Sequence, residues 1–213
     1  MKRDYERELE ALIGSQGPSR PRLLLHSCCG PCSSSVLEFL TQYYRVTLLW
    51  YNPNIWPEGE FDRRLEAQKT LLRAMHLNDT VSLRVMPRES GAWAEATAGL
   101  EAEPEGGERC TECFRLRLRE TARLAAQEGF DCFCSTLTLS RHKDPVRINA
   151  LGEAFAKEFG VKWLPSEFKK RGREQRSQQL CAEYGIYRQN YCGCQYSFRE
   201  DGIQKIQKTE VVS

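Results

Sequence analysis

Three cysteines within five residues, Cys28, Cys29 and Cys32, are the feature that most restricts how this chain can fold. They follow the apolar run 23–25 and precede a segment whose apolar residues recur with helical spacing. The sequence therefore predicts a strand, a tight turn shaped by Gly30 and Pro31, and a helix. Because the first N–H groups of a helix are free and stabilise anions, this turn suits a group of thiolates. The density of the group disfavours the alternative of inert buried cysteines.

Apolar periodicity predicts that strands and helices alternate along most of the chain, whereas segment 91–108 shows no clear pattern. Strands are expected at about residues 22–26, 45–51, 81–85, 130–137 and 161–164. A short surface helix is expected at 4–13, and further helices are expected from the cysteine turn to 43 and across 61–75, 114–125, 148–159 and 173–184. This order is typical of an α/β fold, a Rossmann-like parallel sheet with helices on both faces. Ligands of such sheets bind beyond the carboxyl ends of the strands, so we expect a cysteine-rich metal site there, near Asn52 and Thr136.

The length of 213 residues and the net charge of +2 fit a soluble domain in which any nucleic-acid site is a local patch. No apolar run is long enough to cross a bilayer, and the charged N-terminus lacks a signal-peptide core. We therefore expect a cytoplasmic protein with no membrane partner. We divide the chain into an N-terminal helix and linker (1–21), an α/β domain (22–198) and a C-terminal tail (199–213).

Ten cysteines in a reducing compartment indicate metal or redox chemistry rather than structural disulfides. Cys110 and Cys113 form a C-x-x-C pair, which joins the three turn cysteines as candidates for a four-thiolate site. Such a site suits structural zinc or an iron–sulfur cluster. The spacing alone is also consistent with zinc bound by Cys29-x-x-Cys32 and Cys110-x-x-Cys113. The first group, however, lies in the turn where an α/β enzyme keeps its active site, which favours a functional cluster.

The remaining cysteines fall into different classes. Cys192-Gly193-Cys194 could close a strained, readily reduced disulfide or supply metal ligands. Cys132 and Cys134 alternate within an expected strand and are interpreted as core thiols, and Cys181 is expected to pack within a helix.

Several polar residues have two interpretations each. His26 could bind a metal or substrate, or be a hydrogen-bonded core histidine. Residues 141–144 could hold a polar substrate or form a solvated turn. The basic run Lys169, Lys170 and Arg171, continued by residues 173 and 176, could contact phosphates or be a solvated face, and nearby tyrosines could stack on bases.

Taken together, these motifs resemble the QueH family of epoxyqueuosine reductases, and they run in matching order from about residue 22 to 198. The matching motifs are His26-x-Cys28-Cys29-Gly30-Pro31-Cys32, Tyr51-Asn52-Pro53-Asn54-Ile55, Arg109-Cys110-x-x-Cys113-Phe114-x-Leu116-Arg117, Ser135-Thr136-Leu137, Ser140-x-x-Lys143-Asp144, Phe168-Lys169-Lys170 and Tyr187-Arg188-Gln189-x-Tyr191-Cys192-Gly193-Cys194.

The resemblance implies an oxidoreductase that removes the epoxide oxygen of epoxyqueuosine at the tRNA wobble position. Its electrons would come from an unidentified donor. It implies that a [4Fe-4S] cluster is bound by Cys28, Cys29, Cys110 and Cys113. It further implies that Cys192 and Cys194 form a redox-active, catalytic pair. The family is also said to hold a second metal, a mononuclear iron, and Cys32 is the candidate for contact with it. Tyrosines and basic residues, Lys169 to Arg171 among them, would meet the RNA.

Two other functions remain open at this point. The first is a zinc-stabilised RNA-binding module without catalysis, which fits the basic run but leaves the C-x-C pair unexplained. The second is an ATP-dependent tRNA-thiolating enzyme, which would need a Gly-rich, Ser-containing phosphate loop where this chain carries its cysteine turn.

Overall fold

The computed structural model describes residues 3–198 and contains one five-stranded parallel sheet in the order β3-β2-β1-β4-β5. The expected C-terminal tail, 199–213, lies outside the described residues. The strands are β1 (Arg22–His26), β2 (Arg45–Trp50), β3 (Ser82–Val85), β4 (Cys132–Ser135) and β5 (Lys162–Trp163). The expected α/β class with a parallel sheet is confirmed.

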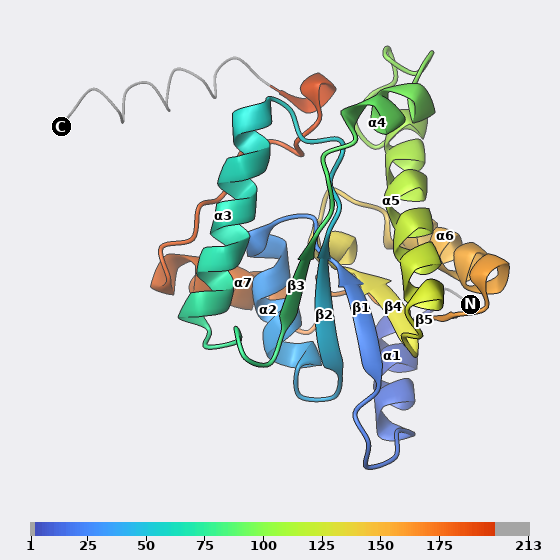
Figure 1. Ribbon diagram of the computed structural model, residues 1–213, viewed down its shortest axis with the longest axis vertical. Coiled ribbons are helices and arrows are strands. Elements are labelled where there is room, and N and C mark those ends of the chain that lie inside the picture. The colour runs from blue at the N-terminus through green and yellow to red at the C-terminus, as the bar shows by residue number, and fades with distance from the viewer. Residues whose placement is uncertain (1–2, 199–213) are drawn as a thin grey trace.

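Helices cover both faces of the sheet (Figure 1). One face carries α2 (Gly30–Leu40), α3 (Glu58–Ala74) and α7 (Arg173–Glu183), and the other carries α5 (Glu108–Gln127) and α6 (Pro145–Phe159). The remaining helical segments are α1 (Tyr5–Gly14), α4 (Ser90–Ala96), η1 (Thr136–Leu139) and η2 (Gln195–Ser197). The segment without a clear sequence pattern therefore contains α4, which packs against α5.

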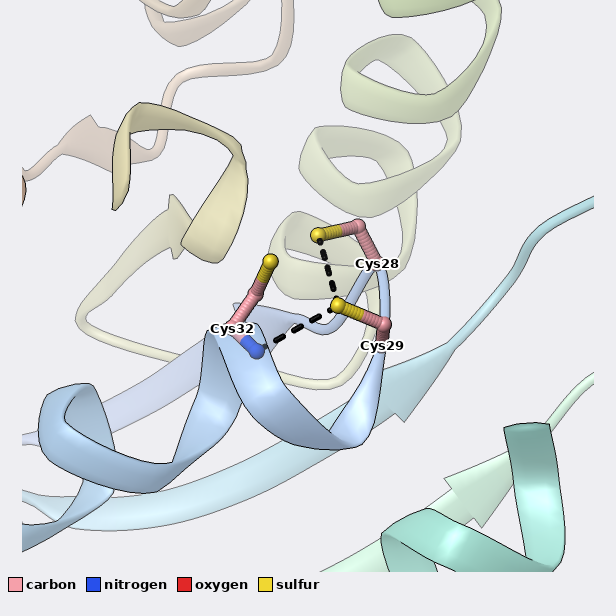
Figure 2. Close-up of side chains that lie close together, drawn as sticks. All are labelled: Cys28, Cys29 and Cys32. Atoms are coloured by element: carbon pink, nitrogen blue, oxygen red, sulfur yellow. Dashed lines mark hydrogen bonds between the residues drawn. The ribbon is translucent and has the colours of Figure 1, made fainter. Parts of the chain in front are cut away.

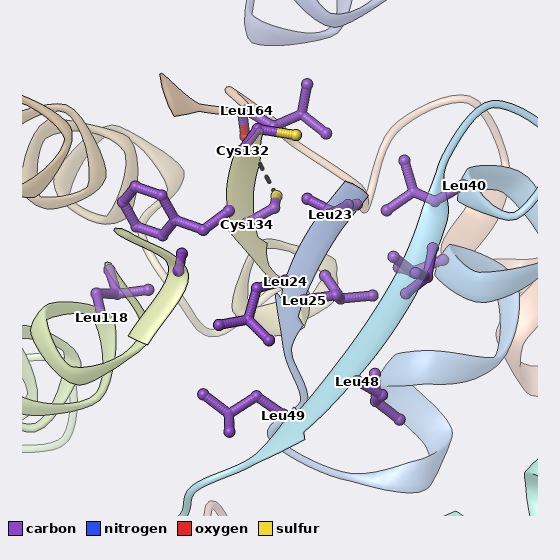
Figure 3. Packing of buried hydrophobic residues seen from close by; sticks show 14 of the residues in the cluster. Leu23, Leu24, Leu25, Leu40, Leu48, Leu49, Leu118, Cys132, Cys134 and Leu164 are labelled. Atoms are coloured by element: carbon purple, nitrogen blue, oxygen red, sulfur yellow. Dashed lines mark hydrogen bonds between the residues drawn. The ribbon is translucent and has the colours of Figure 1, made fainter. Parts of the chain in front are cut away.

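The central strands form the apolar core (Figure 3). Leu23 to Leu25 of β1 and Leu48 and Leu49 of β2 are each at most 1% exposed, as expected for strands covered on both faces. Full burial of each leucine contributes about 1.5–3 kcal/mol. The expected role of Cys132 and Cys134 in packing is borne out, because both are buried in this core. The thiol of Cys134 donates to the carbonyl of Leu164 over 3.2 Å, and burial raises its pKa to about 12.

Several bounds differ from the sequence expectation; α5, for example, begins at Glu108 rather than at residue 114, so Cys110 and Cys113 lie within it. The strand expected over 130–137 ends at Ser135, because the Ser135 hydroxyl accepts a hydrogen bond from the Leu137 N–H (3.2 Å) and begins the short helix η1. The first helix is not merely a surface helix, since Leu9 is completely buried in the core. Its Glu6 is buried as well and pairs with Arg173 at the start of α7.

Candidate active site

The cysteine turn lies between the end of β1 and the start of α2. Cys29 is the N-cap of α2, and its sulfur accepts a hydrogen bond from the backbone N–H of Cys32 (3.3 Å). Pro31 occupies the first turn of the helix, where its missing N–H is not needed. The side chains of Cys28, Cys29 and Cys32 therefore converge, with all three sulfurs within 4.8 Å of one another (Figure 2).

This group of thiols favours one negative charge on Cys28. Hydrogen bonds from Cys29 and Cys32 hold the pKa of Cys28 well below its usual value, assisted by Lys143 and by the Thr136 hydroxyl at 3.3 Å. Burial, reinforced by the neighbouring Cys28, raises the pKa of Cys29 to about 12. The proximity of Cys28 likewise raises the pKa of Cys32. Thiols bind a metal as thiolates, and the metal displaces the protons that remain on them. A group that already shares one negative charge is therefore suited to bind a metal.

Loops after β1, β2 and β4 meet at the turn, as expected for the carboxyl edge of a parallel sheet. The backbone N–H of Cys28 donates to the Thr136 hydroxyl (3.1 Å). The amide of Asn52 donates to the Ser27 carbonyl (2.8 Å). These two bonds fix the position of the turn relative to both neighbouring strands.

His26 belongs to the core beneath the turn rather than to a metal site. Its Nε2 donates to the carbonyl of Tyr51 (3.1 Å), and its Nδ1 accepts from the Ser135 hydroxyl (2.9 Å), so both ring nitrogens are occupied. Burial, followed by the charge of Arg117, lowers the pKa of His26 to about 3. The imidazole is therefore neutral and ties together the ends of three strands.

The second cysteine pair lies in the first turns of α5. Cys110 accepts a hydrogen bond from the Gly106 N–H (3.2 Å), and Cys113 is buried beside Trp93 and Cys194. Burial raises the pKa of both Cys110 and Cys113, and the nearby Cys192 and Cys194 contribute to the increase. The pair on α5 therefore lies near the segment after α7 that carries Cys192 and Cys194, which we call the C-terminal loop.

The thiols thus form two neighbouring groups. Within residues 3–198, the compact group comprises Cys28, Cys29 and Cys32, and it does not include Cys110 or Cys113. Those two lie with the C-terminal pair instead. Every cysteine of the sequence is a free thiol in the structure.

The C-terminal loop has little regular structure and is held by side chains. Arg64 of α3 donates to the carbonyls of Cys192 (3.0 Å) and Tyr191 (3.3 Å). Its guanidinium also pairs with Glu60 (2.6 Å), and both residues are buried. The N–H of Trp56 donates to the Gly193 carbonyl (2.8 Å). Sequence analysis missed Arg64; the Glu60–Arg64 spacing indicates a helical ion pair but not its burial.

A cavity of about 710 Å³ opens beside both thiol groups. Its walls include Cys32, Lys143, Gln189 and Cys192, so the turn and the C-terminal loop contribute to one space. The carbonyl oxygen of the Gln189 side chain is buried without a hydrogen-bond partner in the described residues. The cavity therefore combines sulfur, a cationic amine and a free acceptor, as a site for a polar ligand requires.

The other predicted polar residues separate into different roles. In the segment 141–144, Arg141 pairs with Glu174 (2.5 Å), while the Asp144 side chain caps α6. Burial lowers the pKa of the Lys143 amine, but the nearby Cys28 and Cys192 raise it by more, so the pKa lies above its usual value. Lys143 is therefore the member of this segment whose charge acts at the thiol groups.

The basic run packs against acidic side chains. Lys170 pairs with Glu167 (2.8 Å), which also lies 3.9 Å from Lys169. Arg171 pairs with Glu10 of α1 (2.9 Å). Part of the positive charge of the run is therefore balanced within the protein.

Among residues 3–198, no helix is both long and apolar enough to cross a bilayer.

Comparison with known proteins gives a consistent result across nearly the whole chain. A family profile described as epoxyqueuosine reductase QueH matches residues 23–200. An epoxyqueuosine reductase QueH of Streptococcus pyogenes serotype M1 is 40% identical over 208 residues, which is 96% of this chain and 82% of the relative. The protein of the same name from Staphylococcus epidermidis is 40% identical over 94% of this chain and 87% of its own length. That from Thermotoga maritima is 34% identical over 84% of this chain and 91% of its own.

These matches include both thiol groups and the walls of the cavity between them. The resemblance inferred from the motifs is therefore confirmed, and the alternative of a non-catalytic RNA-binding module is wrong. The chain belongs to the QueH family of epoxyqueuosine reductases and is an oxidoreductase.

Proposed function

We propose that this enzyme reduces epoxyqueuosine to queuosine at the wobble position of tRNA, with a [4Fe-4S] cluster bound by Cys28, Cys29, Cys110 and Cys113. The observation that carries the proposal is the cavity lined by both Cys32 and Cys192. A substrate in this cavity would contact the cysteine turn and the C-terminal pair at once. Membership of the reductase family supplies the chemistry that such contact would serve.

The residues present fit an iron–sulfur cluster. Three sulfurs within 4.8 Å of one another at a helix N-terminus form an anionic cradle, and the pair on α5 adds two more soft ligands. Arg117 and Lys143 bring positive charge to these thiols. A buried, electropositive, thiol-rich setting of this kind stabilises the net negative charge of a cluster with four thiolate ligands. When bound, the cluster would supply single electrons.

The reaction requires two electrons and two protons for each epoxide oxygen, which leaves as water while the two ring carbons that carried it gain a double bond. Oxidation of the Cys192 and Cys194 thiols to a disulfide releases two electrons and two protons, so one such pair balances one turnover. An external electron donor then has to reduce the disulfide. We propose that Lys143, in the cavity wall, donates a hydrogen bond from Nζ to the epoxide oxygen and holds a proton there.

A second role for the C-terminal pair and for Cys32 is the binding of a mononuclear iron beside the cluster. Cys32 and Cys192 line the same cavity, and Cys32 also belongs to the compact thiol group. Iron in this position would act as a Lewis acid toward the epoxide oxygen. Metal content distinguishes this alternative from a cycling disulfide.

The test of the proposal begins with protein purified without oxygen. We expect brown protein with stoichiometric iron and sulfide that converts epoxyqueuosine in tRNA to queuosine, followed by mass spectrometry of the nucleosides. Replacement of both Cys110 and Cys113 with Ala should abolish the cluster, while the core replacements Cys132→Ala and Cys181→Ala should leave it intact. Colourless wild-type protein containing zinc, or full iron in the double variant, would contradict the assignment.

We further propose that the basic run Lys169, Lys170 and Arg171 contacts tRNA phosphates. Each cation that leaves a salt link to meet phosphate makes binding depend on salt, at a slope of about 0.7–0.9 per contact. Replacing all three with Gln should weaken tRNA binding and flatten this slope. An unchanged slope would show that the run does not contact phosphates and pairs only with acidic residues such as Glu10 and Glu167.

A further inference from the structure

Arg117 of α5 is a buried cation whose charge is balanced by no carboxylate in the described part of the chain. The residue is 2% exposed, and no salt bridge within 4.0 Å joins it to an Asp or Glu among residues 3–198. Its Nε donates to the backbone carbonyl of Cys113 (3.0 Å). Its Nη2 is buried and has no hydrogen-bond partner in the same part of the chain. Because an unpaired buried charge is strongly unfavourable, the protein must place an anion nearby for this residue to be tolerated.

Cysteines are the acidic residues that act on the charge of Arg117. Burial opposes the charged form of its guanidinium, but the nearby Cys113, Cys192 and Cys28 nevertheless raise the pKa of Arg117 above its usual value. These three cysteines come from α5, the C-terminal loop and the cysteine turn. Arg117 therefore lies where the separate thiol segments converge.

We propose that Arg117 is a positioning residue for the redox centre: its fixed charge holds the anionic thiolate centre in place and raises its reduction potential. A cluster with four thiolate ligands is negatively charged and gains a further negative charge on reduction, so a nearby buried cation favours the reduced form. Arginine does not release its proton, unlike Lys143, so this charge persists throughout turnover. The inference rests on the proposed function, since it requires an iron–sulfur cluster.

The test compares two arginines on the same helix. Arg117→Met removes the buried charge, Arg117→Lys retains a positive charge, and Arg115→Met removes an exposed arginine that pairs with Glu112. The midpoint potential of each anaerobically purified protein is measured by redox titration with spectroscopic detection. We expect Arg117→Met to shift the one-electron equilibrium at least about tenfold toward the oxidised form, a change of about −59 mV. Arg117→Lys should recover much of this shift, and Arg115→Met should match the wild type.

If Arg117→Met does not retain iron, its potential cannot be measured, and the unfolding temperatures of the metal-free variant and the metal-free wild type are compared instead. If the metal-free variant unfolds at the same or a higher temperature than metal-free wild type, the charge acts on the cluster and the proposal stands. A lower unfolding temperature of the metal-free variant would make Arg117 a structural residue and overturn the proposal. So would a loaded variant with an unchanged potential. Wild-type protein without iron or sulfide would instead refute the proposed cofactor.

Discussion

The cysteine turn and the C-terminal loop both line the cavity, but they are held in place in different ways. The turn is part of the fold itself, since β1 ends in it and Cys29 caps α2. The loop has only the short helix η2 and depends on side chains from elsewhere, above all Arg64. The position of the turn therefore follows from the sheet and from α2, whereas the position of the loop follows from side-chain contacts with α3.

The aromatic contacts of the loop show the same dependence on distant residues. The ring of Phe198 packs edge-on against Trp56 and Tyr191, with centroids 5.2 Å apart in both pairs. Such contacts contribute about 0.5–1.5 kcal/mol each. Together with the hydrogen bonds of Arg64, they explain how a loop with little secondary structure can hold two cysteines beside α5.

The largest expected effect comes from removing one thiol from each region. Cys28→Ser should abolish both iron content and turnover, because it removes the thiol that carries the shared negative charge of the turn. Cys192→Ser and Cys194→Ser should retain the brown cluster and tRNA binding but lose turnover. Iron, sulfide and nucleoside conversion are measured on the same preparations. Loss of iron in either loop variant would identify that thiol as a metal ligand, and full activity in both would exclude a role for the pair.

Removing Arg64 should release the loop while sparing the turn. Arg64→Met leaves the buried Glu60 carboxylate without its cation, which costs about 3–5 kcal/mol of unfolding free energy. We expect activity to fall by at least about tenfold with iron content unchanged. Adding Glu60→Gln should restore much of the stability, measured by denaturant unfolding, but not the activity.

The control for this pair of variants is Arg73→Met on the same helix, which breaks an exposed pair with Glu66 and should cost at most about 1 kcal/mol. If Arg64→Met loses iron as readily as activity, the two regions are not independent.

A substitution of Gly193 tests the backbone of the loop directly. Gly193 has a φ of +126°, and an added Cβ would lie 2.8 Å from Nη1 of Arg64. We expect Gly193→Ala to cost about 1–3 kcal/mol and to reduce turnover more than iron content. Gly59→Ala on α3, where an added Cβ meets nothing within 4 Å, is the control and should not reduce stability. Unchanged kinetics in Gly193→Ala would show that the loop adapts.

Acid is expected to destabilise the fold through His26, the buried histidine beneath the turn. The pKa of His26 in the folded state, about 3, lies below the unfolded value of 6.5, so the unfolded chain binds the proton first. The stability contributed by neutral His26 is thus present above pH 6.5 and is lost by about 1.4 kcal/mol per pH unit as the pH falls toward 3. Denaturant unfolding of metal-free protein measures this slope.

The matched substitutions for the pH response are His26→Gln and His142→Gln, a buried and an exposed histidine. His26→Gln should flatten the slope between pH 6.5 and 5, where few carboxylates titrate, and His142→Gln should leave it as in the wild type. An identical slope in all three proteins would mean that His26 is not the residue responsible.

The sequence alone was sufficient for the order of the strands and of the α-helices other than α4, for the sheet class and for the edge at which the cysteine turn lies. These features have local causes. Apolar spacing determines which face of a helix or strand is buried, and Gly160, which is left-handed with φ 69°, ends α6 because it lacks a Cβ. The cysteine turn follows from the same kind of signal, since Gly30, Pro31 and a capping side chain specify a helix start.

Only the tertiary structure decided which charges are buried and which thiols are neighbours. Helical spacing places Arg117 on the face of Phe114 and Arg64 on the face of Phe61, but whether a charge there is buried or solvated depends on segments far away in the chain. The same holds for the basic run, whose partner Glu10 lies on α1. The approach of Cys192 to Cys113 is also a long-range result, because the Arg64 hydrogen bonds that hold the loop join residues 128 positions apart. Periodicity determines the face on which a side chain lies, whereas the packing of whole elements determines what it meets there.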